Sequence, residues 1–142
     1  MTCVHATTVS IEDRAVLLCG PSGSGKSDLA LRLIDSGAVL IADDRTDLSR
    51  SDNAVMASPP ETLAGLLEIR GVGVVRLPYR SGIPVALVVD LTAEQPPRLP
   101  DNDASRTIEG IDLPCLSLNP FEASAPAKVR AALTYGLGVR TE

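Results

Sequence analysis

The stretch "CGPSGSGKSD" at residues 19–28 matches the phosphate-loop pattern G-x-x-x-x-G-K-[ST]. In this pattern, backbone N–H groups of a glycine-rich turn converge on phosphate oxygens at the N-terminus of a helix. Lys26 is expected to bridge the β- and γ-phosphates, and the Ser27 hydroxyl to bind the Mg²⁺ that neutralises charge during phosphoryl transfer. The stretch therefore predicts ATP and Mg²⁺ as cofactors. The predicted nucleotide-binding residues are Gly20, Pro21, Ser22, Gly23, Ser24, Gly25, Lys26 and Ser27.

The segments that flank this stretch have the periodicity that a phosphate loop requires. Residues 15–19, "AVLLC", form a continuous apolar run that is typical of a buried strand. From Lys26 onward, "KSDLALRLIDS" predicts an amphipathic helix that ends before Gly37. The β-branched segment at 4–11 predicts the other strand of a hairpin, with its turn at residues 12–14.

The register of this hairpin makes the only histidine, His5, a candidate active-site residue. A turn at residues 12–14 sets Ile11 opposite Ala15, and the same register sets His5 level with Pro21. A single histidine in a strand is more often structural than catalytic. The position at the mouth of the phosphate loop favours a role in the site.

Two carboxylates, Asp43 and Asp44, follow a second buried strand, "AVLIA" at residues 38–42. The carboxyl end of a strand beside a phosphate loop suits a carboxylate that binds a metal or accepts a proton. An Asp pair after a strand also commonly begins a turn. Because adjacent strand residues point to opposite faces, we expect at most one of the two side chains to point into the site.

The segment at 65–78, "GLLEIRGVGVVRLP", is strand-like apart from its internal glycines. Gly71 and Gly73 suggest a bulge or a close approach of the backbone to another group. Glu68 and Arg70 alternate with apolar residues and so project from one face. That arrangement is compatible with a solvated surface and with a shared site.

The remaining segments complete a single predicted domain. "IPVALVVDL" at 83–91 predicts a buried strand, and the segment at 92–106, rich in Pro and Asp, predicts a mobile loop. Residues 124–136 predict a C-terminal helix with Pro126 in its first turn. A chain of 142 residues can bury one hydrophobic core, so residues 1–142 are expected to form one domain.

Composition argues against several classes of partner. The net charge is −5 and the Lys and Arg residues form no cluster, which argues against nucleic acid. No apolar run approaches the roughly 18 residues of a membrane span, and the first ten residues lack the features of a signal peptide. We therefore expect a cytoplasmic protein with no membrane contact. The three cysteines match no metal-ligand spacing, so they are expected to be small buried hydrophobic residues.

Together, His5, "GPSGSGKSD" at 20–28, "LIADD" at 40–44 and "LEIRGVGVV" at 67–75 resemble the catalytic domain of HPr kinase/phosphorylase. This bacterial enzyme phosphorylates a serine of the phosphocarrier protein HPr. The resemblance covers residues 4–78 well and the remainder weakly. It implies the α/β phosphate-loop architecture of phosphoenolpyruvate carboxykinase, with a mixed β-sheet flanked by helices. It also implies a homo-oligomer, specifically a hexamer.

The resemblance implies a role for each matching residue. His5 is an active-site residue, Lys26 contacts the phosphates, and Asp44 is the base that takes the proton from the attacking serine. Asp43 is a supporting neighbour. The implied metal ligands are Ser27 and Glu68, and the implied catalytic residues are His5, Lys26, Asp44 and Arg98, the last of which matches a catalytic arginine in a mobile loop. The implied partners are HPr and ATP/ADP.

The chain also departs from the family pattern. The regulatory N-terminal domain of the long members is expected to be absent, because His5 lies almost at the start of the chain. Pro21 and Asp28 stand where the family usually has Asp and Glu. The late family stretch "PVRPGRN", which is tied to dephosphorylation, is replaced by "LNPFEASAPAKVR" at 118–130. We therefore expect HPr serine kinase activity with weak or absent phosphorylase activity.

Two alternative functions stay open from the residues alone. A small-molecule phosphate-loop kinase would have an arginine-rich lid over the nucleotide, whereas the arginines here are scattered. A non-catalytic nucleotide-binding regulator would keep the phosphate loop and lose the base. Asp43, Asp44 and Glu68 are all present, which favours an enzyme.

Overall fold

The structure, a computed structural model, describes residues 1–96 and 105–137. The strands in these ranges are β1 (Thr2–Val4), β2 (Ala6–Ile11), β3 (Arg14–Cys19), β4 (Val39–Ala42), β5 (Thr46–Ser51), β6 (Ala54–Ser58), β7 (Leu66–Ile69), β8 (Gly73–Arg76), β9 (Ile83–Leu91), β10 (Ser105–Ile108) and β11 (Ile111–Leu118). The helices there are α1 (Lys26–Asp35), α2 (Ala125–Tyr135) and a short 3₁₀ turn, Glu61–Leu63. Neither α-helix, nor any other helix of these ranges, has the length and apolar character needed to cross a membrane.

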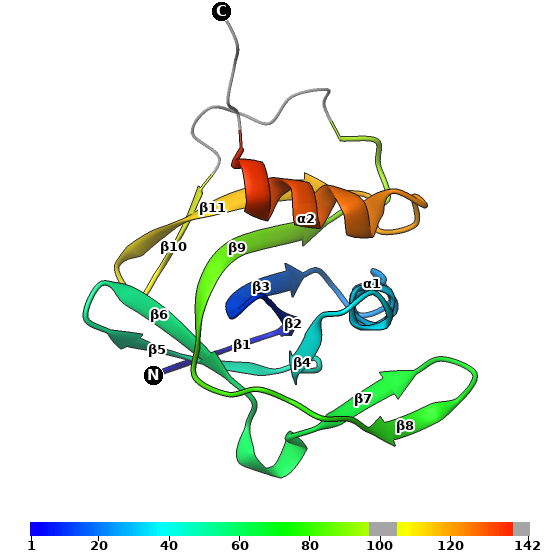
Figure 1. Cartoon of the computed structure of the whole chain (residues 1–142), viewed down its shortest axis with the longest axis horizontal. Helices are drawn as coiled ribbons and strands as arrows, with labels where there is room; N and C mark the ends of the chain where they lie inside the picture. The colour runs from blue at the N-terminus through cyan, green and yellow to red at the C-terminus, as the bar shows by residue number, and fades with distance from the viewer. Residues whose placement is uncertain (97–104, 138–142) are drawn as a thin grey trace, which may run out of the picture.

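Nine strands form one mixed, curled sheet in the order β1-β5-β6-β9-β3-β2-β4, with β11 and β10 continuing from β9 (Figure 1). The pairs β3–β9 and β9–β11 are parallel, and the other pairs are antiparallel. The β7–β8 hairpin forms a separate two-stranded sheet. The α/β architecture implied by the resemblance, a mixed sheet flanked by helices, is therefore confirmed.

Two apolar clusters pack on opposite faces of the sheet. One joins α1 and α2 to the sheet through residues such as Leu29, Val129 and Leu118. The other is built almost entirely from strand residues, among them Ile41 and Leu48, where the sheet curls over itself. Helix α2 covers β9 and β11, and α1 is the next element after β3 in the chain. The two helices therefore flank the loop that joins β3 to α1 (Figure 1).

Helix α1 begins and ends where its residue pattern predicts. Its buried apolar residues, which include Leu29 and Leu33, lie on one face. At its C-terminus, Gly37 has a φ of 114°, and the N–H groups of Gly37 and Ala38 donate to the carbonyls of Ile34 and Leu33 at 3.0 Å each. This hydrogen-bond pattern is the Schellman motif, which explains why glycine stands at this position.

The hairpin that precedes the loop is present, but the predicted register is wrong by one residue. Ile11 pairs with Arg14, and Ala6 pairs with Cys19. The turn contains only two residues, Glu12 and Asp13, whose φ values of 51° and 61° fit a tight two-residue hairpin turn. Neither residue is the glycine or asparagine that usually marks such a turn, so the sequence signal was weak.

Two further expectations are corrected by the strands. Gly71 lies in the turn of the β7–β8 hairpin and Gly73 begins β8, and a Cβ atom at either glycine would have no neighbour within 4 Å. Their positive φ values of 87° and 118° explain why glycine stands at both positions. Neither a bulge nor a close backbone contact is needed to account for these glycines. The loop predicted at 92–106 is shortened, because β10 begins at Ser105. Residues 97–104 of that prediction lie outside the described residues.

Candidate active site

The phosphate loop joins the end of β3 to the start of α1, so it lies at the carboxyl edge of the parallel strands. The N–H of Ser24 donates to the carbonyl of Pro21 at 3.1 Å, which closes a tight turn inside the loop. A Cβ atom at Gly20 would lie 2.5 Å from Ser24 Oγ, so a larger residue at position 20 would displace the Ser24 side chain. The loop therefore presents the N-terminus of α1, where unpaired N–H groups favour anions.

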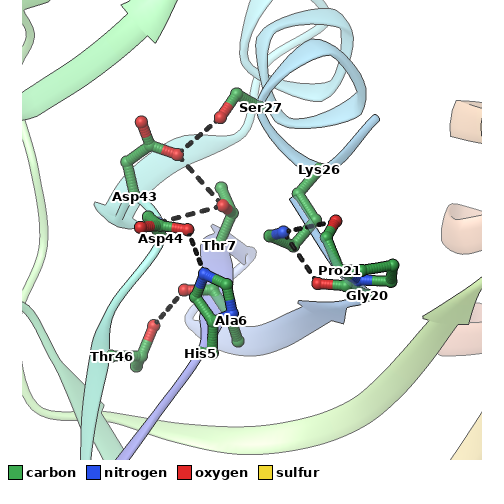
Figure 2. Close-up of polar contacts among 10 residues, drawn as sticks. All are labelled: His5, Ala6, Thr7, Gly20, Pro21, Lys26, Ser27, Asp43, Asp44 and Thr46. Atoms are coloured by element: carbon green, nitrogen blue, oxygen red, sulfur yellow. Dashed lines mark hydrogen bonds and ion pairs between the residues drawn. The ribbon is translucent and has the colours of Figure 1, made fainter. Parts of the chain in front are cut away.

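Lys26 is only 6% exposed and its ammonium group lies inside the loop. Its Nζ donates hydrogen bonds to the carbonyl oxygens of Gly20 at 2.8 Å and Pro21 at 3.0 Å (Figure 2). A buried cation needs such partners, because an unpaired buried charge is costly. The side chain is thus held at the position where phosphate oxygens would approach the loop.

Asp43 connects three elements around the loop. Its Oδ1 accepts hydrogen bonds from Ser27 Oγ of α1 at 2.7 Å and from Thr7 Oγ1 of β2 at 3.0 Å (Figure 2). Its Oδ2 accepts from the backbone N–H of Glu68 in β7 at 3.0 Å. The resemblance assigned Asp43 only a supporting place, whereas the structure places its carboxylate directly on the loop serine.

Asp44 and His5 form an exposed pair beside Asp43. His5 Nε2 lies 2.5 Å from Asp44 Oδ1, with side chains 52% and 57% exposed (Figure 2). A carboxylate oxygen that lacks a proton can only accept, so in this pair Nε2 carries the proton. Despite the register error, His5 does lie at the mouth of the site, because the contact to Asp44 comes from the end of β4.

Both carboxylates face the site, so the expectation that only one would do so is wrong. Strand alternation stops at Ala42, where β4 ends. Asp44 has a φ of 68°, and the N–H of Arg45 donates to the carbonyl of Asp43 at 2.8 Å, which makes Asp44 the centre of a γ-turn. This sparsely populated conformation turns the Asp44 side chain toward His5, and strained backbone of this kind concentrates at functional sites.

Thr7 is a site residue that sequence reasoning missed. Its buried hydroxyl donates to Asp43 and accepts the backbone N–H of Asp44 at 3.1 Å, so it holds both carboxylates. The signal in the sequence is the group of hydroxyl residues in the strand segment "ATTVS" at 6–10, and the structure buries all of them.

The remaining predicted residues have a less direct relation to the site. The Glu68 carboxylate is exposed, and its contact with the site is made by the backbone. Arg70 lies exposed in the turn after β7. Arg98 lies outside the described residues, so its role stays a prediction.

The donor atoms at the loop fit a magnesium ion that is bound together with a nucleotide. Ser27 Oγ and Asp43 Oδ1 are hard oxygen donors within 2.7 Å of each other. Magnesium sites of phosphoryl-transfer enzymes use one or two carboxylates, with phosphate oxygens and waters completing the octahedron. Residues 1–96 and 105–137 contain no group of three His, Cys, Asp or Glu side chains that would hold a metal without a nucleotide.

A second polar cluster lies on the other side of β3. Arg106 of β10 donates to both carboxylate oxygens of Asp90 in β9, at 2.7 and 2.9 Å, and Cys115 Sγ donates to Asp90 at 3.3 Å. Burial raises the pKa of the Cys115 thiol to about 11, and the hydrogen bond to Asp90 contributes to that rise. Burial also raises the pKa of the Cys19 thiol. These two thiols are therefore protonated at neutral pH. Both are only partly buried and Cys3 is exposed, so the expectation that the three cysteines are buried is wrong.

Comparison with known proteins agrees with this geometry. A family model described as the HPr serine kinase C-terminal domain matches residues 1–129. The chain belongs to this family. The HPr kinase/phosphorylase of Enterococcus faecalis is 39% identical over 125 residues, which are 80% of this chain and 40% of that protein. The HPr kinase/phosphorylase of Lactobacillus acidophilus is 35% identical over 127 residues, which are 81% of this chain and 39% of that protein.

A solved structure of the same family extends the comparison to nearly the whole chain. The HPr(Ser) kinase/phosphatase from Coxiella burnetii superposes with a TM-score of 0.78 at 26% sequence identity. The match covers 92% of this chain and 93% of that one. The chain spans only about two fifths of the length of the Enterococcus faecalis and Lactobacillus acidophilus proteins.

Proposed function

We propose that this chain is an ATP-dependent protein-serine kinase domain that phosphorylates HPr. The observation that carries the proposal is the placement of two pairs beside one phosphate loop: Ser27 with Asp43, and His5 with Asp44. The names of the relatives, which are HPr kinase/phosphorylases and an HPr(Ser) kinase/phosphatase, support the choice of HPr as the acceptor. A cytoplasmic location stays a prediction of the sequence, and a homo-oligomeric state stays an expectation from the family resemblance.

The nucleotide side of the site uses the loop and its lysine. Backbone N–H groups of residues 20–27 bind phosphate oxygens, and Lys26 exchanges its carbonyl partners for the β- and γ-phosphates. Ser27 Oγ and Asp43 would hold Mg²⁺ together with ATP, with Glu68 of β7 as a second carboxylate, and the ion would supply neutralisation of the phosphate charge. Thr7 keeps the Asp43 carboxylate aimed at Ser27.

The acceptor side of the site uses Asp44. The serine oxygen of HPr attacks the γ-phosphorus, the bond from that phosphorus to the ADP oxygen breaks, and the serine proton passes to the Asp44 carboxylate. His5 holds Asp44 Oδ1 and so leaves Oδ2 for the serine hydroxyl. His5 is therefore a positioning residue, and Asp44 is the base.

The test is phosphate transfer to purified HPr. The chain is incubated with HPr, γ-labelled ATP and Mg²⁺, and phosphoserine is located by mass spectrometry. We expect incorporation into one serine, and none into an HPr variant in which that serine is alanine. Absence of transfer to HPr, with transfer to a nucleoside or metabolite instead, would overturn the proposal in favour of a small-molecule kinase.

A further inference from the structure

The only phenylalanine of the chain, Phe121, lies beside the phosphate loop and is 64% exposed. It precedes α2, in the segment that follows β11. A Cβ atom built on Gly25 would lie 3.0 Å from Pro120 Cγ and 3.4 Å from the Cε1 and Cζ atoms of Phe121. The edge of the ring therefore packs against the last glycine of the loop, while most of the side chain stays open to solvent.

The position of this ring is fixed by the backbone on either side of it. Arg32 of α1 donates to the carbonyl of Pro120 and to that of Glu122, the latter at 3.2 Å. Asn119 Oδ1 accepts the backbone N–H of Phe121 at 3.0 Å. Three hydrogen bonds thus fix the backbone that carries this large apolar side chain at the surface.

The ring lies on the side of the loop from which a nucleoside would extend. The β- and γ-phosphates are the ones that meet Lys26, and Ser27 faces Asp43 at the end of β4. In Figure 1, β4 and β7 lie below α1, whereas the segment that leads into α2 lies above it. A triphosphate whose γ-end pointed to Asp43 and Asp44 would therefore extend its α-phosphate and nucleoside toward the opposite side of α1, where the segment that contains Phe121 lies beside Gly25.

We propose that Phe121, backed by Pro120 and Gly25, is the stacking platform for the base of the bound nucleotide. This inference rests on the proposed function, because it needs a nucleotide on the phosphate loop. Aromatic rings bind nucleobases through their π-faces, and such stacking tolerates any base. The platform adds affinity for the nucleoside part of the ligand and none for its phosphates.

The test compares ATP with inorganic tripolyphosphate, both with Mg²⁺, in calorimetric titrations. We expect Phe121→Ala to weaken ATP binding about tenfold and to leave tripolyphosphate binding unchanged, since stacking acts on the base alone. Phe121→Tyr should restore ATP affinity to within about twofold. The matched control is Tyr135→Ala, which removes a 77% exposed aromatic side chain from the far end of α2 and should change neither ligand.

A second measurement reports proximity directly. The chain contains no Trp, so Phe121→Trp introduces a single fluorophore at the platform. ATP should quench its emission and tripolyphosphate should not, while a Tyr135→Trp variant should respond to neither ligand.

Two results would overturn the platform and leave the kinase proposal intact. One is a Phe121→Ala variant that binds ATP like the unmodified chain. The other is an equal loss of ATP and tripolyphosphate affinity, which would mean that Phe121 only supports the loop. An unmodified chain that binds neither ligand would overturn both the platform and the proposed function.

Discussion

Asp43 Oδ1 lies 2.7 Å from Ser27 Oγ, which joins the end of β4 to the first turn of α1. In phosphate-loop enzymes, a strand carboxylate and the loop hydroxyl hold the magnesium ion together. This contact suggests different roles for the neighbouring residues Asp43 and Asp44. In the proposed mechanism Asp43 would hold the metal, and Asp44, which contacts His5, would accept the proton.

Substituting the two aspartates separately tests this division. Asp44→Asn should lower turnover by roughly 10²-fold or more and leave ATP affinity within a few-fold, which is the usual scale for losing a general base. Asp43→Asn should instead raise the Mg²⁺ concentration needed for half-maximal activity. Both are measured in a kinase assay with HPr over a range of ATP and Mg²⁺ concentrations. An Asp44→Asn variant that keeps most of its turnover would reverse the assignment of Asp44 as the base and Asp43 as the metal ligand.

The phosphate loop gives a second prediction. Lys26→Ala and Ser27→Ala should each abolish nucleotide-dependent activity, because in the proposed mechanism these side chains contact phosphate and metal. Circular dichroism should show an unchanged fold, since neither residue belongs to the two apolar clusters. The control is Lys128→Ala, which removes a surface ion pair to Glu122 and should be fully active. Normal activity of Lys26→Ala would mean that the loop binds no nucleotide productively.

The elements that carry the site were predictable, since their signals are local. An apolar run before the loop, helical periodicity after it and the "ADD" at the end of the next strand correspond to β3, α1 and the end of β4. The C-terminal helix was also visible, because Ser124 and Pro126 mark its start. Each of these features depends on a few neighbouring residues.

What could not be predicted depends on backbone conformations that the residue types disfavour. Glu12, Asp13 and Asp44 all have positive φ values, and none is a glycine. The first two set the hairpin register, and the third turns a second carboxylate into the site. The pair of Arg106 with Asp90 brings β10 and β9 together across 16 positions of sequence, which no local pattern shows.

The raised thiol pKa values give a third prediction. With a pKa of about 11, only about one in a thousand Cys115 side chains is a thiolate at pH 8, so it should react slowly with iodoacetamide. The exposed Cys3 should be labelled first, as followed by peptide mass spectrometry. Raising the pH to 10 should speed labelling of Cys115 by about a hundredfold, because the thiolate fraction rises by that factor. Asp90→Asn should also speed it, by removing a carboxylate that raises the pKa. Labelling of Cys115 as fast as Cys3 at pH 8 would contradict the assignment.

The fourth prediction concerns the direction of the reaction. Transfer to a serine needs the loop, a metal and a base. Removal of phosphate from phosphoserine also needs inorganic phosphate held as the nucleophile, and hence a further anion site. The cations of the segment at 118–130 are already engaged: Lys128 pairs with Glu122 at 2.9 Å, and Arg130 donates to the carbonyls of Leu33 and Ser36 at 3.0 and 3.1 Å.

We therefore expect the chain to phosphorylate HPr at least about tenfold faster than it dephosphorylates serine-phosphorylated HPr, because Glu122 has the wrong charge for a phosphate site. The measurement is pyrophosphate release from phosphorylated HPr with Mg²⁺ and millimolar phosphate, beside the kinase assay on the same preparation. Glu122→Gln, which removes the repelling charge and frees Lys128, should raise the dephosphorylation rate and leave the kinase rate unchanged. Equal rates in the two directions would show that another group, such as a residue of a neighbouring subunit, holds the phosphate.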